Sequence, residues 1–165
     1  FIQAEPASPV GLIQALGLMG TSSDTNQGMR RLALASFCFR GFTCDPEEVE
    51  RLVGKRAERT GKAGVPTAPG RRPLTRSFVC YELALPLDTR LDEMVPRLIT
   101  HVGGVETVAH ASARVAPEFL EVDLLLPVKD SPEQEGGFIE HSTLQLLAQL
   151  GATLSLDFTS HWTEA

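Results

Sequence analysis

A cysteine stands among acids in GFTCDPEEVERLVG, residues 41 to 54, where the candidate groups are Cys44, Asp45, Glu47, Glu48 and Glu50. Carboxylates that converge on one point bind hard cations, and a cysteine before a helix N-terminus can act as a thiolate. The spacing, however, is typical of a helix start, with Asp45 as the cap and Pro46 in the first turn. First-turn acids face the positive end of the helix dipole and project in different directions. We therefore expect a structural role here and no bound metal ion.

Further acids fall on segments whose alternation predicts β-strands. In EFLEVDLLLPV, residues 118 to 128, the acids Glu121 and Asp123 alternate with Leu and Val. Successive side chains of a strand point to opposite faces, so these acids lie opposite the apolar face. Glu82 and Asp157 hold the same position in two other predicted strands. If helices cover the apolar side, an open sheet face carries Glu82, Glu121, Asp123 and Asp157, together with the apolar Phe78, Phe119 and Leu125.

Such an open face could receive the basic surface of another protein. The alternative is a solvated face whose acids serve only solubility. Paired carboxylates can also perform acid–base catalysis, but nothing in the sequence selects a nucleophile or a substrate. We predict no catalytic residue. Whether the protein is an enzyme stays open, and we favour the alternative that it is not.

A basic segment follows the first predicted helix. Residues 51 to 76 hold eight Lys and Arg against the single acid Glu58, a balance of +7, so the rest of a chain of net charge −6 carries −13. The segment could bind a small ligand or an anion through Arg71, Arg72 and Arg76, or it could be a solvated loop. It has no aromatic residue for base stacking, and the negative net charge further disfavours nucleic acid as a partner.

The cysteines and histidines lack the spacing of a metal site. The histidines form no H-x-x-x-H pair, and the three cysteines, an odd count without C-x-x-C, are Cys38, Cys44 and Cys80. This count argues against a disulfide framework and a zinc site. We expect reduced thiols, a cytoplasmic location and no metal or cofactor. No apolar run approaches the roughly 18 residues that span a bilayer, so we expect no membrane partner.

The elements that must position these groups alternate along the chain. Strands are predicted at 31–42, 77–85, 118–128 and 152–160, and helices at 45–54, 89–104, 105–116 and 142–150. The two middle helices could be one broken helix, and Pro96 either follows a cap at Asp92 or kinks a longer helix. Ser142 to Gln145 predicts a capping box for the last helix. Residues 55–76 show no periodicity.

These elements predict an α+β fold, a two-layer α/β sandwich. We expect a four-stranded, mostly antiparallel sheet in the order β-α-β-α-β-α-β, with all helices on one face; a ferredoxin-like arrangement is one candidate. Residues 1–28 hold no Lys or Arg and read as an extension or linker, and 29–165 as a single α/β domain. With 42% apolar and 22% charged residues, the composition suits a globular domain.

One set of motifs resembles a known family. ASFCFRGFTCDPEEVERLVG, then a Gly/Arg loop, SFVCYEL and STLQLLAQLGATLSLDF are similar in order to the bacterial domain-of-unknown-function 4279 family over about residues 31 to 160. The matching positions are Gly41, Pro46, Gly54, Gly151, Asp157 and Phe158. Phe78 and Phe158 depart from the Trp and Tyr that are usual there. The resemblance implies a small bacterial α/β domain without an assigned activity or cofactor, some of whose relatives look like immunity proteins of toxin systems.

We therefore expect a small cytoplasmic protein-binding domain whose acidic sheet face binds another protein. Its concrete version is an immunity protein that neutralises a basic toxin domain through Glu82, Glu121, Asp123 and Asp157. The alternative is a small-ligand or anion-binding domain that uses the segment 51–76. The sequence leaves the oligomeric state open.

Overall fold

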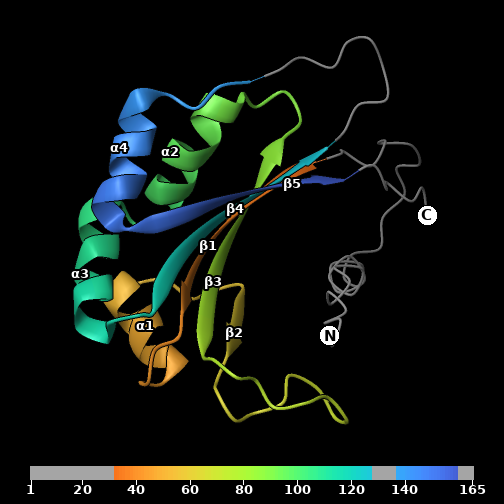
Figure 1. The fold of residues 1–165 in the computed structure, drawn as a ribbon, viewed down its shortest axis with the longest axis vertical. Helices are drawn as coiled ribbons and strands as arrows, with labels where there is room; N and C mark the ends of the chain where they lie inside the picture. Colours follow the sequence, from red (N-terminus) through yellow and green to blue (C-terminus); the bar gives the residue numbers. More distant parts are fainter. Residues whose placement is uncertain (1–31, 128–136, 160–165) are drawn as a thin grey trace, which may run out of the picture. The chain divides into compact units, whose positions relative to one another are not determined.

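The computed structural model describes residues 32–127 and 137–159 (Figure 1). The chain divides into two units, Phe1–Arg30 and Arg31–Ala165, and every described residue belongs to the second. The predicted extension at 1–28 lies outside the described residues. None of the described helices is long and apolar enough to cross a membrane.

Five strands and four helices make up the described part of the chain. In chain order they are β1 (Leu32–Arg40), α1 (Pro46–Val53), β2 (Arg59–Gly61), β3 (Phe78–Pro86), α2 (Leu91–His101), α3 (Val105–Val115), β4 (Phe119–Pro127), α4 (His141–Leu150) and β5 (Ala152–Thr159). The α+β class is confirmed. The predicted count of four strands and the strict alternation are wrong, because β2 precedes β3 without a helix and α2 precedes α3 without a strand.

The sheet has the strand order β2-β3-β1-β4-β5. All neighbours are antiparallel except β4 and β5, which are parallel and joined through α4. Two chain units, β1-α1-β2 and β3-α2-α3-β4, are each split, since a strand of the other unit lies between their parallel strands. The two units thus interleave in the sheet. Strand β5, which follows α4, adds a fifth strand at one edge.

The helices α1 to α4 all lie on one side of the sheet (Figure 1). The side chains that face them are apolar and alternate along each strand, for example Phe37, Tyr81 and Leu124, all fully buried. Val49, Leu98 and Val108 of the helices complete this core. Burial raises the pKa of the Tyr81 hydroxyl, which donates to the carbonyl of Lys55 at 3.4 Å. Among the described residues, helices thus cover one face of the sheet, and no helix packs on the other, which we call the uncovered side.

The helix ends follow their local sequence in part. Helix α1 starts after Asp45 and stops at Gly54, whose φ of 75° is the left-handed conformation that glycine adopts without strain. Helices α2 and α3 are separate elements, divided by Gly103 and Gly104. The proposed cap at Asp92 is wrong, since α2 begins one residue earlier and keeps Pro96 in its interior.

The capping box of the last helix is also wrong. Helix α4 begins at His141, with Glu140 at the cap position. Ser142 therefore lies inside the first turn, where its hydroxyl donates to Glu140 Oε2 at 3.4 Å. The S-x-x-Q pattern correctly indicated that a helix begins in this part of the chain, but it did not identify the first helical residue.

Candidate functional site

The uncovered side of the sheet brings together the four acids named from the sequence. Register pairs Ser36 of β1 with both Glu82 of β3 and Asp123 of β4, which places the three side chains on one face. Glu121 lies two residues from Asp123, and Asp157 pairs with Leu125 of the same face. We call this surface the open sheet face: Ser36, Cys38, Arg40, Arg59, Phe78, Cys80, Glu82, Phe119, Glu121, Asp123, Leu125, Ser155 and Asp157. The shared face is confirmed, and its binding role stays a prediction.

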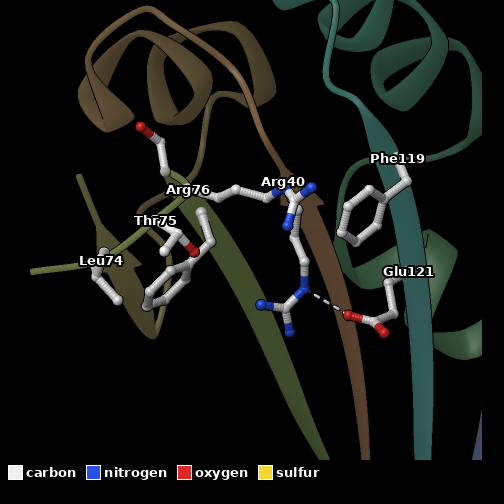
Figure 2. Close-up of a pocket in the computed structure, with 8 residues that line it drawn as sticks. Arg40, Leu74, Thr75, Arg76, Phe119 and Glu121 are labelled. Atoms are coloured by element: carbon white, nitrogen blue, oxygen red, sulfur yellow. Dashed lines mark hydrogen bonds and ion pairs between the residues drawn. The ribbon is translucent and has the colours of Figure 1, made fainter. Parts of the chain in front are cut away.

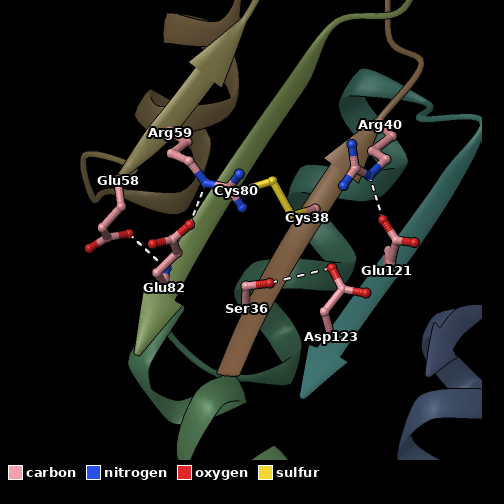
Figure 3. The surroundings of a disulfide bond; sticks show 9 residues. All are labelled: Ser36, Cys38, Arg40, Glu58, Arg59, Cys80, Glu82, Glu121 and Asp123. Atoms are coloured by element: carbon pink, nitrogen blue, oxygen red, sulfur yellow. Dashed lines mark hydrogen bonds and ion pairs between the residues drawn. A yellow bond between two sulfur atoms is a disulfide. The ribbon is translucent and has the colours of Figure 1, made fainter. Parts of the chain in front are cut away.

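Two of the four acids are already paired with arginines of the same face. Arg40 Nε lies 2.5 Å from Glu121 Oε2, and Arg59 forms an ion pair with Glu82 (Figure 3). Sequence reasoning missed both arginines. Arg40 continues the alternation of β1, which could have placed it, but Arg59 lies on the three-residue strand β2, which has no periodic signal. The face is therefore one of mixed charge, with Asp123 and Asp157 as its acids outside these two ion pairs.

The surroundings of Asp123 on the open sheet face shift the pKa of its carboxyl. Partial burial raises the pKa of its carboxyl, and the negative charges of Glu121 and Asp157 raise it further. Arg40 and the hydroxyl of Ser36, which donates to Asp123 Oδ2 at 3.4 Å, act in the opposite direction. The described histidines, His101, His110 and His141, all lie on helices and hence in the other layer. The Ser36–Asp123 contact thus has no histidine from the described residues to complete a triad.

A disulfide joins Cys38 and Cys80 in the middle of the open sheet face (Figure 3). The two residues are 42 apart in sequence, pair directly across β1 and β3 with a Cα–Cα distance of 4.2 Å, and are buried. The expectation that the cysteines form no disulfide is therefore wrong. The number of cysteines contains no information on strand register, which places Cys38 and Cys80 side by side. The third cysteine, Cys44, is unpaired.

The thiol of Cys44 is poorly suited to chemistry. Burial raises its pKa, and the carboxylates of Glu48 and Asp45 raise it further, against the lowering effect of a backbone hydrogen bond. A raised pKa keeps a thiol protonated and therefore weakly nucleophilic. Asp45 does not cap α1 with its side chain and instead pairs with Lys62. Both findings agree with a structural role for this stretch.

One end of the open sheet face is hollowed into a depression of about 380 Å³ (Figure 2). Its lining consists of Arg40, Leu74, Thr75, Arg76, Ser77, Phe78, Phe119 and Glu121. The guanidinium of Arg40 lies 5.9 Å from the ring centre of Phe78, and that of Arg76 lies 5.8 Å from the ring centre of Phe119. Arg76 Nε also lies 2.5 Å from Glu118 Oε2. The depression therefore offers apolar rings beside two ion-paired guanidinium groups, Arg40 with Glu121 and Arg76 with Glu118.

The basic segment does not gather its arginines at one point. Arg76 lines the depression, whereas Arg71 and Arg72 are exposed and are not among the lining residues. Arg71 and Arg72 lie in a loop that folds back on itself, where Gly64 N donates to Leu74 O at 2.8 Å and Leu74 N donates to Val65 O at 3.1 Å. The anion-binding hypothesis thus narrows to Arg76 together with Arg40, which lies outside the predicted segment.

Comparison with protein-family models, curated proteins and solved structures finds no match to this chain. The resemblance to the domain-of-unknown-function 4279 family remains a prediction.

Proposed function

We propose that this protein is a binding module that receives another protein on its open sheet face. The observation that carries the proposal is a sheet side that none of the helices in residues 32–127 and 137–159 covers. Its depression combines apolar rings with ion-paired charges. Phe119 exposes 36% of its surface beside Arg76 and Glu121. Apolar and aromatic contact area surrounded by polar groups is the anatomy of a protein interface.

The charge pattern says what kind of partner fits. Asp123 and Asp157 offer negative charge, whereas the paired Glu82 and Glu121 are offset by Arg59 and Arg40. A partner of mixed surface, with basic groups above the two aspartates and an apolar group over the depression, matches this face. Neutralisation of a basic toxin domain is the concrete version that we propose, in keeping with the resemblance drawn from the sequence.

The test measures binding of the protein encoded by the adjacent reading frame, by calorimetry with the purified full chain. Reversal of both aspartates, Asp123→Lys with Asp157→Lys, is expected to weaken binding at least tenfold, because like charges then face the partner's basic groups. The control carries the same charge change on the helix layer, Glu47→Lys with Glu106→Lys, at two exposed positions. Unchanged binding by the first variant, or equal loss in both, overturns the proposal.

A second candidate function is the binding of an anion in the depression, favoured by the presence of both Arg40 and Arg76 in its lining. An anion would take the place of Glu118 or Glu121 beside one guanidinium. A thermal shift with inorganic phosphate that is lost in Arg76→Ala and kept in Arg71→Ala with Arg72→Ala would support this candidate. No shift in the unmodified chain excludes it.

The cytoplasmic location stays a prediction and has lost one of its supports. It rested on unpaired cysteines, whereas Cys38 and Cys80 form a disulfide. Structural disulfides are rare in reducing compartments. Quantification of free thiols in protein taken directly from cells decides the point, since three thiols per chain indicate a reducing setting and one indicates an oxidising setting.

A further inference from the structure

The two edges of the sheet differ in how they are protected. At one edge lies β2, which has three residues, includes Arg59 and is exposed or half-exposed throughout. At the other lies β5, which has eight residues, and within the described residues no strand pairs with its outer side. An edge strand presents unpaired N–H and C=O groups, and proteins usually protect such an edge with short length, charge or proline.

Strand β5 has little of this protection. Its sequence, ATLSLDFT, contains no proline, lysine or arginine, and its single charge is Asp157. On the helix side of the sheet its apolar residues are only partly covered. Leu156 exposes 40% and Phe158 exposes 66% of its surface. A long, apolar and unprotected edge is a surface made for strand pairing.

Helix α4, which packs on β5, extends this uncharged surface. Its sequence, HSTLQLLAQL, contains no Asp, Glu, Lys or Arg, and Leu144 exposes 48% of its surface. Asp157 is therefore the single Asp, Glu, Lys or Arg in residues 141 to 159 of a chain that is 22% charged. Depletion of charge around exposed apolar side chains distinguishes the core of an interface from ordinary surface.

We propose that β5 pairs antiparallel with β5 of a second copy of this chain, about a two-fold axis at Leu156. An axis perpendicular to the sheet keeps both helix layers on the same side, so residues that face the helices pair with each other. In this register Leu156 lies opposite Leu156 of the second copy, and Leu154 lies opposite its Phe158. The exposed apolar side chains of the two copies then cover one another.

Avoidance of like charges favours a second copy in this register as the occupant. On the open side of the sheet the same register places Asp157 opposite Ser155 of the second copy, twice by symmetry. A two-fold axis at Asp157 would instead oppose two like charges, which destabilises a strand pair. The edge is thus self-complementary in the register centred on Leu156, as a two-fold interface requires.

Sedimentation equilibrium of the full chain over a concentration series tests the location of the interface. We expect a reversible dimer, and at least a tenfold weaker one in Phe158→Lys, because a charge is then buried against Leu154 of the second copy. Val65→Lys is the matched control, since Val65 is 50% exposed on the loop before β3. Circular dichroism shows whether each variant is folded. A monomer at every concentration, or an unchanged dimer in folded Phe158→Lys, overturns the proposal.

Substitution of Ser155 tests the register. Ser155→Lys creates two cross-strand ion pairs with Asp157 and is expected to tighten the dimer by about threefold to tenfold, whereas Ser155→Asp weakens it. Thr153→Asp is the control, because residue 153 also lies beside an acid of its own chain, Glu121, but opposite the uncharged residue 159 of the second copy. Changes of the same sign in the two Ser155 variants overturn the register.

Discussion

The two faces of one sheet are built from alternate residues of the same strands and have opposite character. Along β1, Phe37 and Phe39 face the helices and are fully buried, whereas Ser36, Cys38 and Arg40 face outward and contact polar or covalent partners. The covered face is stabilised by burial of apolar surface, which depends on the area removed from water and little on which apolar side chains are adjacent. On the open sheet face, hydrogen bonds, ion pairs and a disulfide hold the side chains. Which of these contacts form depends on which residues the strand register places side by side.

The largest expected effect lies on the covered face. Phe37→Ala should lower the free energy of unfolding by about 3 to 5 kcal/mol, because it removes a fully buried ring and leaves a cavity. Urea denaturation measures the change. Phe119→Ala is the matched substitution on the open sheet face and should cost much less. Equal losses in the two variants would remove the distinction between the faces.

The disulfide should be the contact of the open sheet face whose contribution to stability comes closest to that of a buried side chain on the covered face. Replacement of both Cys38 and Cys80 by alanine should cost about 3 to 4 kcal/mol, since the bond closes a long loop in the unfolded chain. Urea denaturation with and without reductant measures this. Cys44→Ala is the control, and its stability should keep its dependence on reductant. A chain whose stability ignores reductant would contradict the expectation.

The ion pairs of the open sheet face should contribute little. In a double-mutant cycle of Arg40→Gln and Glu121→Gln, we expect a coupling free energy of about 0.2 to 1 kcal/mol, because both side chains are about one-third exposed. The coupling should fall as salt is added. A coupling above about 2 kcal/mol would show that this pair acts like a buried one.

The smallest effect concerns Asp123 and depends on pH. Its raised pKa means that ionisation opposes folding, so the stability it contributes is full below the unfolded pKa of about 3.9 and is lost as pH rises through the folded pKa. Asp123→Asn should therefore stabilise the protein at pH 7, by less than about 1 kcal/mol in this half-exposed site, and should have no such effect at pH 3. Thermal melts at both pH values measure the difference; Asp157→Asn, at an exposed position, is the control.

The local sequence pattern predicted most of the helices and strands and the face of the sheet on which the acids lie. Contacts between distant segments determined the features that it missed. Alternation in β4 placed Glu121 and Asp123 on the uncovered side, and Asp45, Pro46 and Gly54 marked α1 correctly. Both signals act within a few residues, so a single sequence contains them.

The features that were missed depend on contacts between distant segments. Strand β2 has three residues, too few for a period, and exists because it pairs with β3. The Cys38–Cys80 bond and the Arg59–Glu82 pair likewise depend on register between strands that the chain brings together from far apart. No count or spacing along the chain contains that register, which explains why the face was predicted as acidic and found to be mixed.

The cross-link also changes what a cut in the chain would do. It encloses α1, β2 and the arginine-rich loop in one covalent ring, because all three lie between Cys38 and Cys80. A trypsin-like protease that cleaves after the exposed Arg71 would therefore open the ring without releasing a fragment. The nicked protein would migrate as one species until reductant separates its two pieces. This exposed basic loop can thus be severed while the sheet on both sides of it stays a single covalent body.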